Sequence, residues 1–322
     1  MARKDSSSSP VYDIKSPMTD LSVALCGMRL GNPTMLAAGV LDETGRTMAE
    51  VARAGAGAVV TKSIGKEPRQ GHNNPCVVEL DVGLLNAMGL PNPGIETYSA
   101  EIAEAKKGGV PVIGSVFGGT EEEIAEMAQL VQAAGADAVE LNLSCPHAKG
   151  YGAEVGSTPE MVESVCRASK AGLRVPLLAK LTPNTASISK LAAAAEHGGA
   201  DAVVAINTVK AMAISPEARM PILANRFGGL SGPAIRPIGV RCVYEIYDAV
   251  DIPIVGVGGV ATAKDALEYI MAGATAVQIG TAVWTRGTKV FGEVAVGIAG
   301  FMEENGYRSV GDMLGVAHGD GR

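Results

Sequence analysis

Eight short apolar runs recur along this chain, and longer amphipathic segments separate them. The runs are rich in Val, Ile, Leu and Ala and show little polar alternation, as strands buried on both faces do. They cover residues 34–38, 58–62, 110–115, 138–143, 176–180, 202–207, 253–257 and 276–279. Eight strand–helix units in one chain favour an α/β fold that closes into a (β/α)₈ TIM barrel, with an open doubly wound sheet as the alternative.

The segments between the runs carry apolar residues at helical spacing. Helices are predicted over residues 121–134, 159–170, 187–197, 235–250, 263–272 and 289–304. Residues 21–25 and 28–30 predict a short N-terminal hairpin. Two long insertions, residues 63–93 and 208–233, interrupt the rhythm after the second and sixth strands. Long loops in compact domains are usually functional, so both are expected at the C-terminal face of the barrel, where barrel enzymes hold their sites.

Length, charge and cysteine usage narrow the class of protein. The 322 residues fit one barrel domain over residues 18–322, preceded by a disordered, Ser-rich tail over residues 1–17. The net charge of −7 and the lack of a basic block argue against nucleic-acid binding, and no apolar run is long enough to span a membrane. The five cysteines form no CxxC pair and the four histidines show no metal-ligand spacing. A reduced, cytoplasmic protein without a metal site is therefore expected.

A cysteine follows the fourth strand in the segment Asn142-Leu-Ser-Cys145-Pro-His147, and a Gly-rich stretch comes next. Catalytic cysteines act as thiolates and need a shaped, partly exposed setting, which a strand end followed by a loop can supply. Cys145 is therefore a candidate catalytic residue. The alternative is a buried cysteine that ends a core strand.

Two lysines, Lys62 and Lys180, end apolar runs. A buried lysine is costly unless it is paired, so both are expected to point at an anion or an electron-rich ring. The alternative for each is a side chain that leaves the barrel mouth for solvent.

Glycines follow the last two strands, in Gly256-Val-Gly-Gly259 and Gly280-Thr281. Backbone N–H groups at such loops bind phosphate, and the end of strands seven and eight is where barrels commonly hold one.

The segment Asn86-Ala-Met-Gly-Leu90-Pro-Asn-Pro-Gly94 predicts a rigid turn. Its Asn amide suits an amide or imide ring, although a plain Asn-Pro-Gly turn would look the same.

These motifs, in this order, resemble the dihydroorotate dehydrogenases, in particular the cytosolic Cys-type enzymes and their NAD-linked B form. The resemblance spans about residues 21–315. It rests on Thr61-Lys-Ser63, Asn86-Ala-Met-Gly-Leu90, Asn142-Leu-Ser-Cys145-Pro, Ala179-Lys-Leu-Thr-Pro-Asn184, Ile206-Asn-Thr208, Gly228-Gly-Leu-Ser-Gly-Pro-Ala-Ile235, Gly258-Gly259 and Gly280-Thr281. Each motif alone is weak, whereas the ordered set is specific. The resemblance implies oxidation of dihydroorotate to orotate in pyrimidine biosynthesis.

The resemblance also implies FMN in the barrel mouth and a role for each site residue. Lys180 would face the N1/O2 side of the isoalloxazine ring and stabilise the reduced, anionic flavin. Cys145 would remove a proton from C5 of dihydroorotate while the C6 hydride passes to flavin N5. The FMN phosphate would lie on Gly258, Gly259, Gly280 and Thr281, with Gly232 nearby, and the flavin would be lined by Ala38, Lys62, Ser63, Ser115, Asn142 and Ile206. Orotate would be held by Lys62, Asn86, Ala87, Met88, Gly89, Leu90, Asn142, Asn207 and Thr208.

Three positions depart from the family pattern. His147 stands where the family often has Asn, Ala38 where it usually has Ser, and Ser115 where B-form enzymes often have Asn. His147 also makes the segment similar to the pyrimidine-reducing domain of dihydropyrimidine dehydrogenases, which would mean reduction of uracil or thymine on the same flavin scaffold. Lys62 beside the segment 86–90 favours orotate, because its carboxylate needs a cation and a backbone cradle.

Two interpretations from other functional classes remain open at this point. Lys180 could be the Schiff-base lysine of an aldolase-type barrel, or the barrel could bind a ligand without catalysis. For the flavin reading, the resemblance implies a homodimeric core and, in the B form, a second subunit that carries FAD and an iron–sulfur cluster. This chain has no ligand set for such a cluster, so it is expected to dock that partner or to pass electrons to fumarate or another small acceptor.

Overall fold

Eight parallel strands close into a barrel in the order β10-β15-β16-β3-β4-β7-β8-β9. The computed structural model describes residues 19–143 and 156–321. The barrel strands are β3 (Thr34–Leu36), β4 (Ala58–Val60), β7 (Val112–Val116), β8 (Ala138–Asn142), β9 (Leu177–Leu181), β10 (Ala202–Ala205), β15 (Ile254–Val257) and β16 (Ala274–Ile279). Each strand overlaps one of the eight apolar runs, so the predicted (β/α)₈ barrel is confirmed and the open sheet is wrong.

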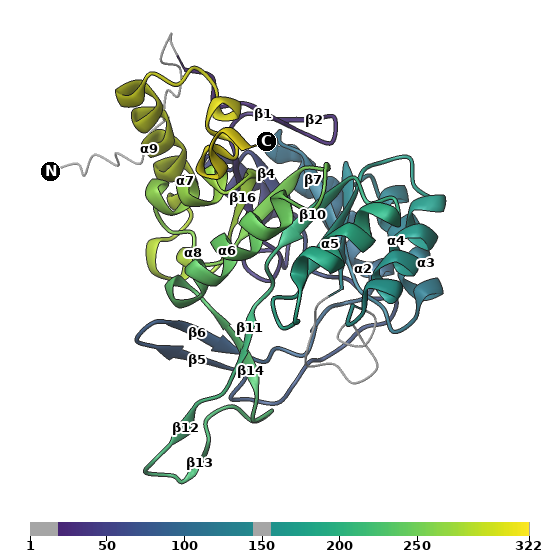
Figure 1. Cartoon of the computed structure of the whole chain (residues 1–322). Coiled ribbons are helices and arrows are strands. Elements are labelled where there is room, and N and C mark those ends of the chain that lie inside the picture. Colours follow the sequence, from purple (N-terminus) through teal and green to yellow (C-terminus); the bar gives the residue numbers. More distant parts are fainter. Residues whose placement is uncertain (1–18, 144–155, 322) are drawn as a thin grey trace, which may run out of the picture.

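Helices surround the barrel and connect its strands (Figure 1). The six that the periodicity predicts are α3 (Glu121–Ala133), α4 (Pro159–Ala171), α5 (Ile188–His197), α6 (Arg236–Tyr247), α7 (Ala263–Met271) and α9 (Val290–Asn305). The structure adds α1 (Gly45–Arg53), α2 (Ile95–Ala105), α8 (Ala282–Arg286) and the 3₁₀ turns η1 (Lys106–Gly108), η2 (Pro233–Ile235), η3 (Val310–Met313) and η4 (Val316–Gly321). Threonine side chains cap four of these helices, since Thr44, Thr120, Thr158 and Thr262 each accept a hydrogen bond from a first-turn backbone N–H.

The barrel strands lack polar alternation because both of their faces are covered. Every residue of β3, β4, β7, β9, β10 and β15 is buried. Outward side chains meet the helices, and inward side chains fill the barrel interior. Polar groups inside such a barrel must find partners there, which makes the few inward charged residues informative.

The two long insertions fold together. Strands β5 (Val77–Leu80) and β6 (Gly83–Asn86) come from the first, and β11 (Val209–Ala211) and β14 (Gly228–Ser231) from the second. They form one antiparallel sheet in the order β11-β14-β6-β5, with a further hairpin of β12 (Ile214–Ser215) and β13 (Met220–Pro221). Figure 1 shows this sheet projecting below the barrel. The insertions follow β4 and β10, so the sheet covers the C-terminal face as expected.

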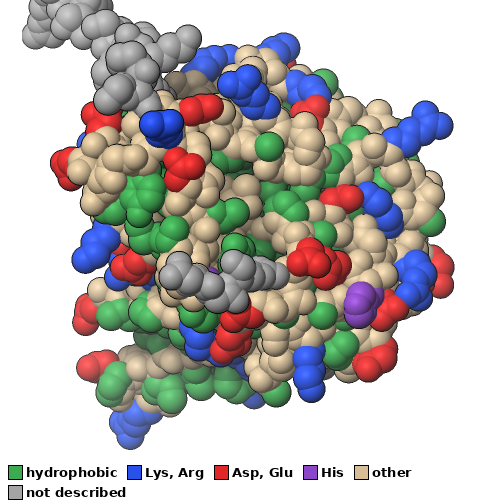
Figure 2. All heavy atoms as spheres, turned by 45° about the horizontal axis from the view of Figure 1, so that its top comes forward, with side chains coloured by type: hydrophobic (Ala, Val, Ile, Leu, Met, Phe, Trp, Pro, Cys, Tyr) green, Lys and Arg blue, Asp and Glu red, His purple; other side chains and the backbone are tan. Residues whose placement is uncertain are grey.

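The predicted N-terminal hairpin is also present, as β1 (Val23–Leu25) and β2 (Met28–Leu30), at the end of the barrel opposite the insertion sheet (Figure 1). On the face shown in Figure 2, basic and acidic side chains are interspersed. Within residues 19–143 and 156–321, no helix combines the length and the apolar character needed to cross a membrane.

Candidate active site

One cavity of about 650 Å³ opens at the C-terminal ends of the barrel strands. Its walls come from two sources, the strand ends of the barrel and the sheet made by the insertions. This volume lies in the range of pockets that enclose small ligands or cofactors. The site is therefore where the barrel architecture places it, with the insertion sheet as its outer wall.

Most of the residues singled out in the sequence line this cavity. They are Ala38, Lys62, Ser63, Asn86, Met88, Gly89, Leu90, Asn142, Lys180, Ile206, Asn207, Thr208, Gly232, Gly258, Gly259, Gly280 and Thr281. They come from all parts of the chain between residues 38 and 281, and the fold brings them together. Cys145 and His147 lie outside the described residues, so their roles stay predictions.

Two of the predicted contact residues do not line the cavity. Ala87 packs into a small core with Leu85 and Leu223, because side chains alternate along an extended segment and its neighbours Asn86 and Met88 take the cavity side. Ser115 is fully buried behind Ser63, and the two hydroxyl oxygens lie 2.8 Å apart. Ser115 thus contacts the cavity wall rather than the cavity.

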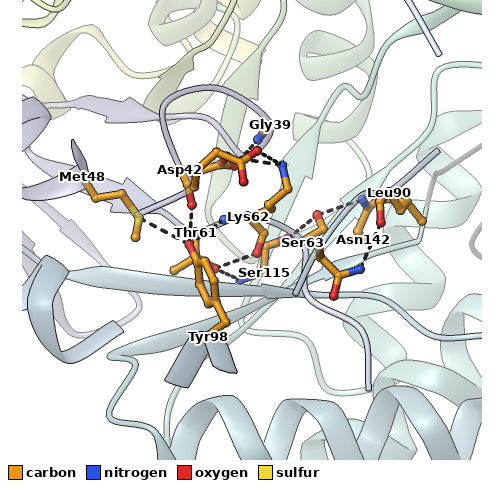
Figure 3. Close-up of polar contacts among 12 residues, drawn as sticks. Gly39, Asp42, Met48, Thr61, Lys62, Ser63, Leu90, Tyr98, Ser115 and Asn142 are labelled. Atoms are coloured by element: carbon orange, nitrogen blue, oxygen red, sulfur yellow. Dashed lines mark hydrogen bonds and ion pairs between the residues drawn. The ribbon is translucent and has the colours of Figure 1, made fainter. Parts of the chain in front are cut away.

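Lys62 is buried at the end of β4, and its ammonium is paired. Its Nζ lies 2.7 Å from Glu43 Oε1 and 3.9 Å from Asp42 Oδ1, both on the loop after β3. Figure 3 shows the Lys62 side chain extending toward Asp42, with Tyr98 beneath. Burial raises the pKa of the Asp42 carboxyl, and the nearby Lys62 charge opposes that rise. Lys62 therefore stays at the cavity, and the solvent-facing alternative is wrong.

A row of polar side chains crosses the cavity wall from the loop after β4, through the end of β8, to the loop after β10. Asn142 Nδ2 donates to Ser63 Oγ at 3.1 Å, and Asn207 Nδ2 lies 3.4 Å from Asn142 Oδ1. The side-chain oxygen of Asn207, Oδ1, accepts a hydrogen bond from the backbone N–H of Thr208 at 2.8 Å. These contacts fix the amides in orientation, which suits recognition of a ring with alternating donors and acceptors.

Lys180 lies deeper, in the barrel interior, with 6% of its surface exposed. Its Nζ donates to Gln278 Oε1 at 3.1 Å and lies 3.3 Å from Glu140 Oε1. The ammonium is thus held by two strands while it lines the cavity floor. The solvent-facing alternative is wrong for Lys180 as well.

The glycines after β15 and β16 leave an open cradle at the other end of the cavity. Gly259 has a φ of +71°, and a Cβ there would approach Gly232 O to 2.7 Å. A Cβ at Gly280 would meet only Ala37 Cβ at 3.5 Å and Val40 Cγ2 at 3.8 Å, and both of those residues line the cavity. Side chains are thus absent where a phosphate would approach the backbone, so the cradle fits one.

Several residues that shape the site were not predicted. Glu43, Glu140 and Gln278 hold the two lysines, and Ser231 accepts a hydrogen bond from Thr281 Oγ1 at 2.8 Å. Trp284 on α8 lines the cavity mouth with 63% of its surface exposed. Glu140 could have been found, because a carboxylate inside the apolar run 138–143 requires a buried partner.

The thiols in the described part of the chain are poor candidates for a nucleophile. Burial raises the pKa of Cys26 and Cys166 to about 12 and that of Cys242 to about 11, so all three stay protonated near neutral pH. Cys76 is partly exposed but does not line the cavity. Among the described residues, no group of His, Cys, Asp and Glu is arranged to hold a metal ion.

Fold and site together define a (β/α)₈-barrel protein with a cationic ligand cavity and a phosphate cradle at the C-terminal face. Comparison with known proteins gives the family. The family model for dihydroorotate dehydrogenase matches residues 20–302, and the chain belongs to that family.

Three similar relatives carry the name dihydroorotate dehydrogenase B (NAD(+)), catalytic subunit. The protein of Methanosarcina acetivorans is 54% identical over 296 residues, which cover 91% of this chain and 95% of the relative. That of Thermoplasma acidophilum is 54% identical over 300 residues, covering 93% and 99%. That of Pyrococcus abyssi is 53% identical over 297 residues, covering 92% and 99%.

Proposed function

We propose that this protein oxidises dihydroorotate to orotate in pyrimidine biosynthesis, with FMN as its cofactor. The observation that carries the proposal is that buried Lys62, buried Lys180 and an open glycine cradle meet in one cavity. Lys62 would meet the substrate carboxylate, Lys180 the flavin ring, and the glycine cradle the FMN phosphate. Membership of the dihydroorotate dehydrogenase family supports the same assignment.

The residues present fit FMN. Gly258, Gly259, Gly280 and Thr281 would hold its phosphate, and Lys180 would face its ring from the cavity floor. FMN, when bound, would accept the hydride that leaves C6 of dihydroorotate. The insertion sheet covers the cavity and restricts the access of water to that transfer.

This chain's own side chains bind and orient the substrate. Lys62 would pair with the substrate carboxylate, and the amides of Asn142 and Asn207 would hold the ring. Cys145, which lies outside the described residues, would take the proton from C5. Loss of a C5 proton and a C6 hydride leaves the C5–C6 double bond of orotate.

The substrate assignment is tested by comparing dihydroorotate with dihydrouracil, which lacks the carboxylate. With a dye as electron acceptor, we expect turnover of dihydroorotate and little turnover of dihydrouracil. Lys62→Gln should lower kcat/KM for dihydroorotate by about 10–10²-fold, since a hydrogen bond to a charged group contributes ~1.5–3 kcal/mol. Faster turnover of dihydrouracil by the wild-type protein would support the dihydropyrimidine alternative instead.

The phosphate cradle is tested by Gly280→Ala. The added methyl fits the folded protein but lies at the cavity wall, so we expect FMN affinity to fall about tenfold or more, as overpacking a fitted site costs ~1–3 kcal/mol. Fluorescence of Trp284, the chain's single tryptophan, can follow the titration of protein stripped of flavin. Gly300→Ala on α9, where a Cβ meets nothing within 4 Å, is the matched control. Equal FMN affinity in both variants would show that the FMN phosphate does not bind at this cradle.

The aldolase-type reading of Lys180 is not supported. Its Nζ is held in the barrel interior by Glu140 at 3.3 Å and Gln278 at 3.1 Å, and the chain belongs to the dihydroorotate dehydrogenase family. No observation favours the hypothesis that the barrel binds a ligand without catalysis.

We infer that the protein works with an electron-transfer subunit that carries FAD and an iron–sulfur cluster, around a homodimeric core. The name of the relatives, each the catalytic subunit of an NAD(+)-linked form, supports the existence of a second subunit. The homodimeric core and the cofactors of that subunit follow from the family resemblance. We further propose a cytoplasmic location, for which the free thiols of the described cysteines are the physical support.

A further inference from the structure

Glu140 is a carboxylate inside the barrel that the reaction as described above does not use. It lies in β8 between apolar neighbours, and its side chain is fully buried. Its Oε1 lies 3.3 Å from Lys180 Nζ, and its Oε2 accepts Gln278 Nε2 at 2.7 Å. Gln278 Oε1 in turn accepts Lys180 Nζ at 3.1 Å. The three side chains close a triangle of contacts in which every polar side-chain oxygen of Glu140 and Gln278 is engaged.

The triangle spans the barrel interior. Strands β8 and β9 are neighbours, and Asn142 pairs with Lys180 in their register. Strand β16, which carries Gln278, lies on the opposite side of the closed barrel from β8. The ammonium is thus fixed from two sides of the barrel rather than by one flexible contact.

Only one member of the triangle reaches the cavity. Lys180 lines it, whereas Glu140 and Gln278 do not. A lysine ammonium has three N–H donors, and two of them face Glu140 and Gln278. The third has no partner among residues 19–143 and 156–321, and because Lys180 lines the cavity this donor is available to a ligand there. Glu140 can therefore affect a bound ligand only through Lys180. It sets the position of the Lys180 ammonium and offsets its positive charge.

We propose that Glu140 is a positioning residue that aims one N–H of Lys180 at the flavin and, through its charge, lowers the reduction potential of that flavin. The inference rests on the proposed function. A lone ammonium would favour the reduced, anionic flavin strongly, because charges interact strongly in a dry interior. The carboxylate offsets that charge, so the Lys180–Glu140 pair donates a hydrogen bond while presenting little net charge.

The test is the two-electron midpoint potential of FMN in the purified holoprotein. Glu140→Gln keeps the shape of the side chain and removes its charge. We expect the equilibrium constant for flavin reduction to rise at least tenfold, which for a two-electron couple is a shift of about +30 mV. Glu304→Gln, which removes an exposed carboxylate on α9 outside the cavity, is the matched control, and its potential should equal that of the wild type.

The double variant Glu140→Gln/Gln278→Glu moves the carboxylate to the other partner of Lys180. It should have a wild-type potential, and it tests the proposal even where Glu140→Gln alone does not fold. A Glu140→Gln potential equal to that of the wild type, or an equal shift in Glu304→Gln or in the double variant, would overturn the proposal. Protein that binds no FMN at all would instead overturn the proposed function, so the two failures are distinguishable.

Discussion

Replacing Cys145 with Ala is expected to slow dihydroorotate oxidation by a factor on the order of 10²–10⁴, the typical effect of a positioned general base. FMN should stay bound and orotate should still bind, because both are held by other residues of the cavity. The measurement is stopped-flow reduction of bound FMN by dihydroorotate without oxygen. Cys76→Ala, which removes a partly exposed thiol outside the cavity, is the matched control and should keep the wild-type rate.

The same prediction has a pH signature. A thiol acts as a base only after it loses its proton, so the wild-type rate should rise with pH through an ionisation near roughly 8.5, the value of an unperturbed thiol. Cys145→Ser should retain some activity only at higher pH, since a hydroxyl is a far weaker acid. Cys166 and Cys242 cannot produce this profile, because burial raises their pKa to about 12 and about 11. If Cys145→Ala reduces its flavin at the wild-type rate, Cys145 has a structural role only.

Replacing Lys180 with Met should have a large effect on both folding and flavin. Glu140 would remain buried without its ionic partner, which costs about 3–5 kcal/mol for a broken buried pair. The N–H that Lys180 offers to the cavity would also be lost, so FMN content and the rate of flavin reduction should fall. Urea unfolding and FMN content of the purified variant measure the two effects.

A double variant separates these effects. Lys180→Met/Glu140→Gln removes both charges, so most of the lost stability should return, because a buried pair replaced as a whole costs little. The rate of flavin reduction should stay low, since the cation is still missing. Full recovery of that rate would show that Lys180 acts only on stability, and would contradict its assignment to the flavin.

The barrel could be predicted because each of its strands leaves a local pattern in the sequence. Strands covered on both faces become apolar runs, and eight such runs between helical segments leave few alternatives. Helices α1 and α2 were not predicted. Both nevertheless bury residues at helical spacing, Met48 with Val51 and Ala52 in α1, and Tyr98 with Ile102 and Ala105 in α2. The local pattern was therefore present in both segments.

Much of the cavity lining could be predicted, but the contacts that hold its side chains in place could not. Lys62 and Lys180 were found because a lysine after an apolar run requires an explanation. Their partners lie far away in sequence, as with Gln278, which is 98 residues from Lys180. The joining of the two insertions into one sheet is likewise a long-range event, with Asn86 paired to Gly229. Single-sequence patterns carry no information on such pairings.

The central claim is that this cavity holds FMN and transfers hydride from dihydroorotate. The most direct measurement adds dihydroorotate, without oxygen or any other acceptor, to the purified yellow protein and follows the visible flavin absorption. Bleaching of that absorption, with one orotate formed for each FMN reduced, is the predicted result. A colourless protein, or a flavin that stays oxidised with dihydroorotate but bleaches with dihydrouracil, would contradict the account.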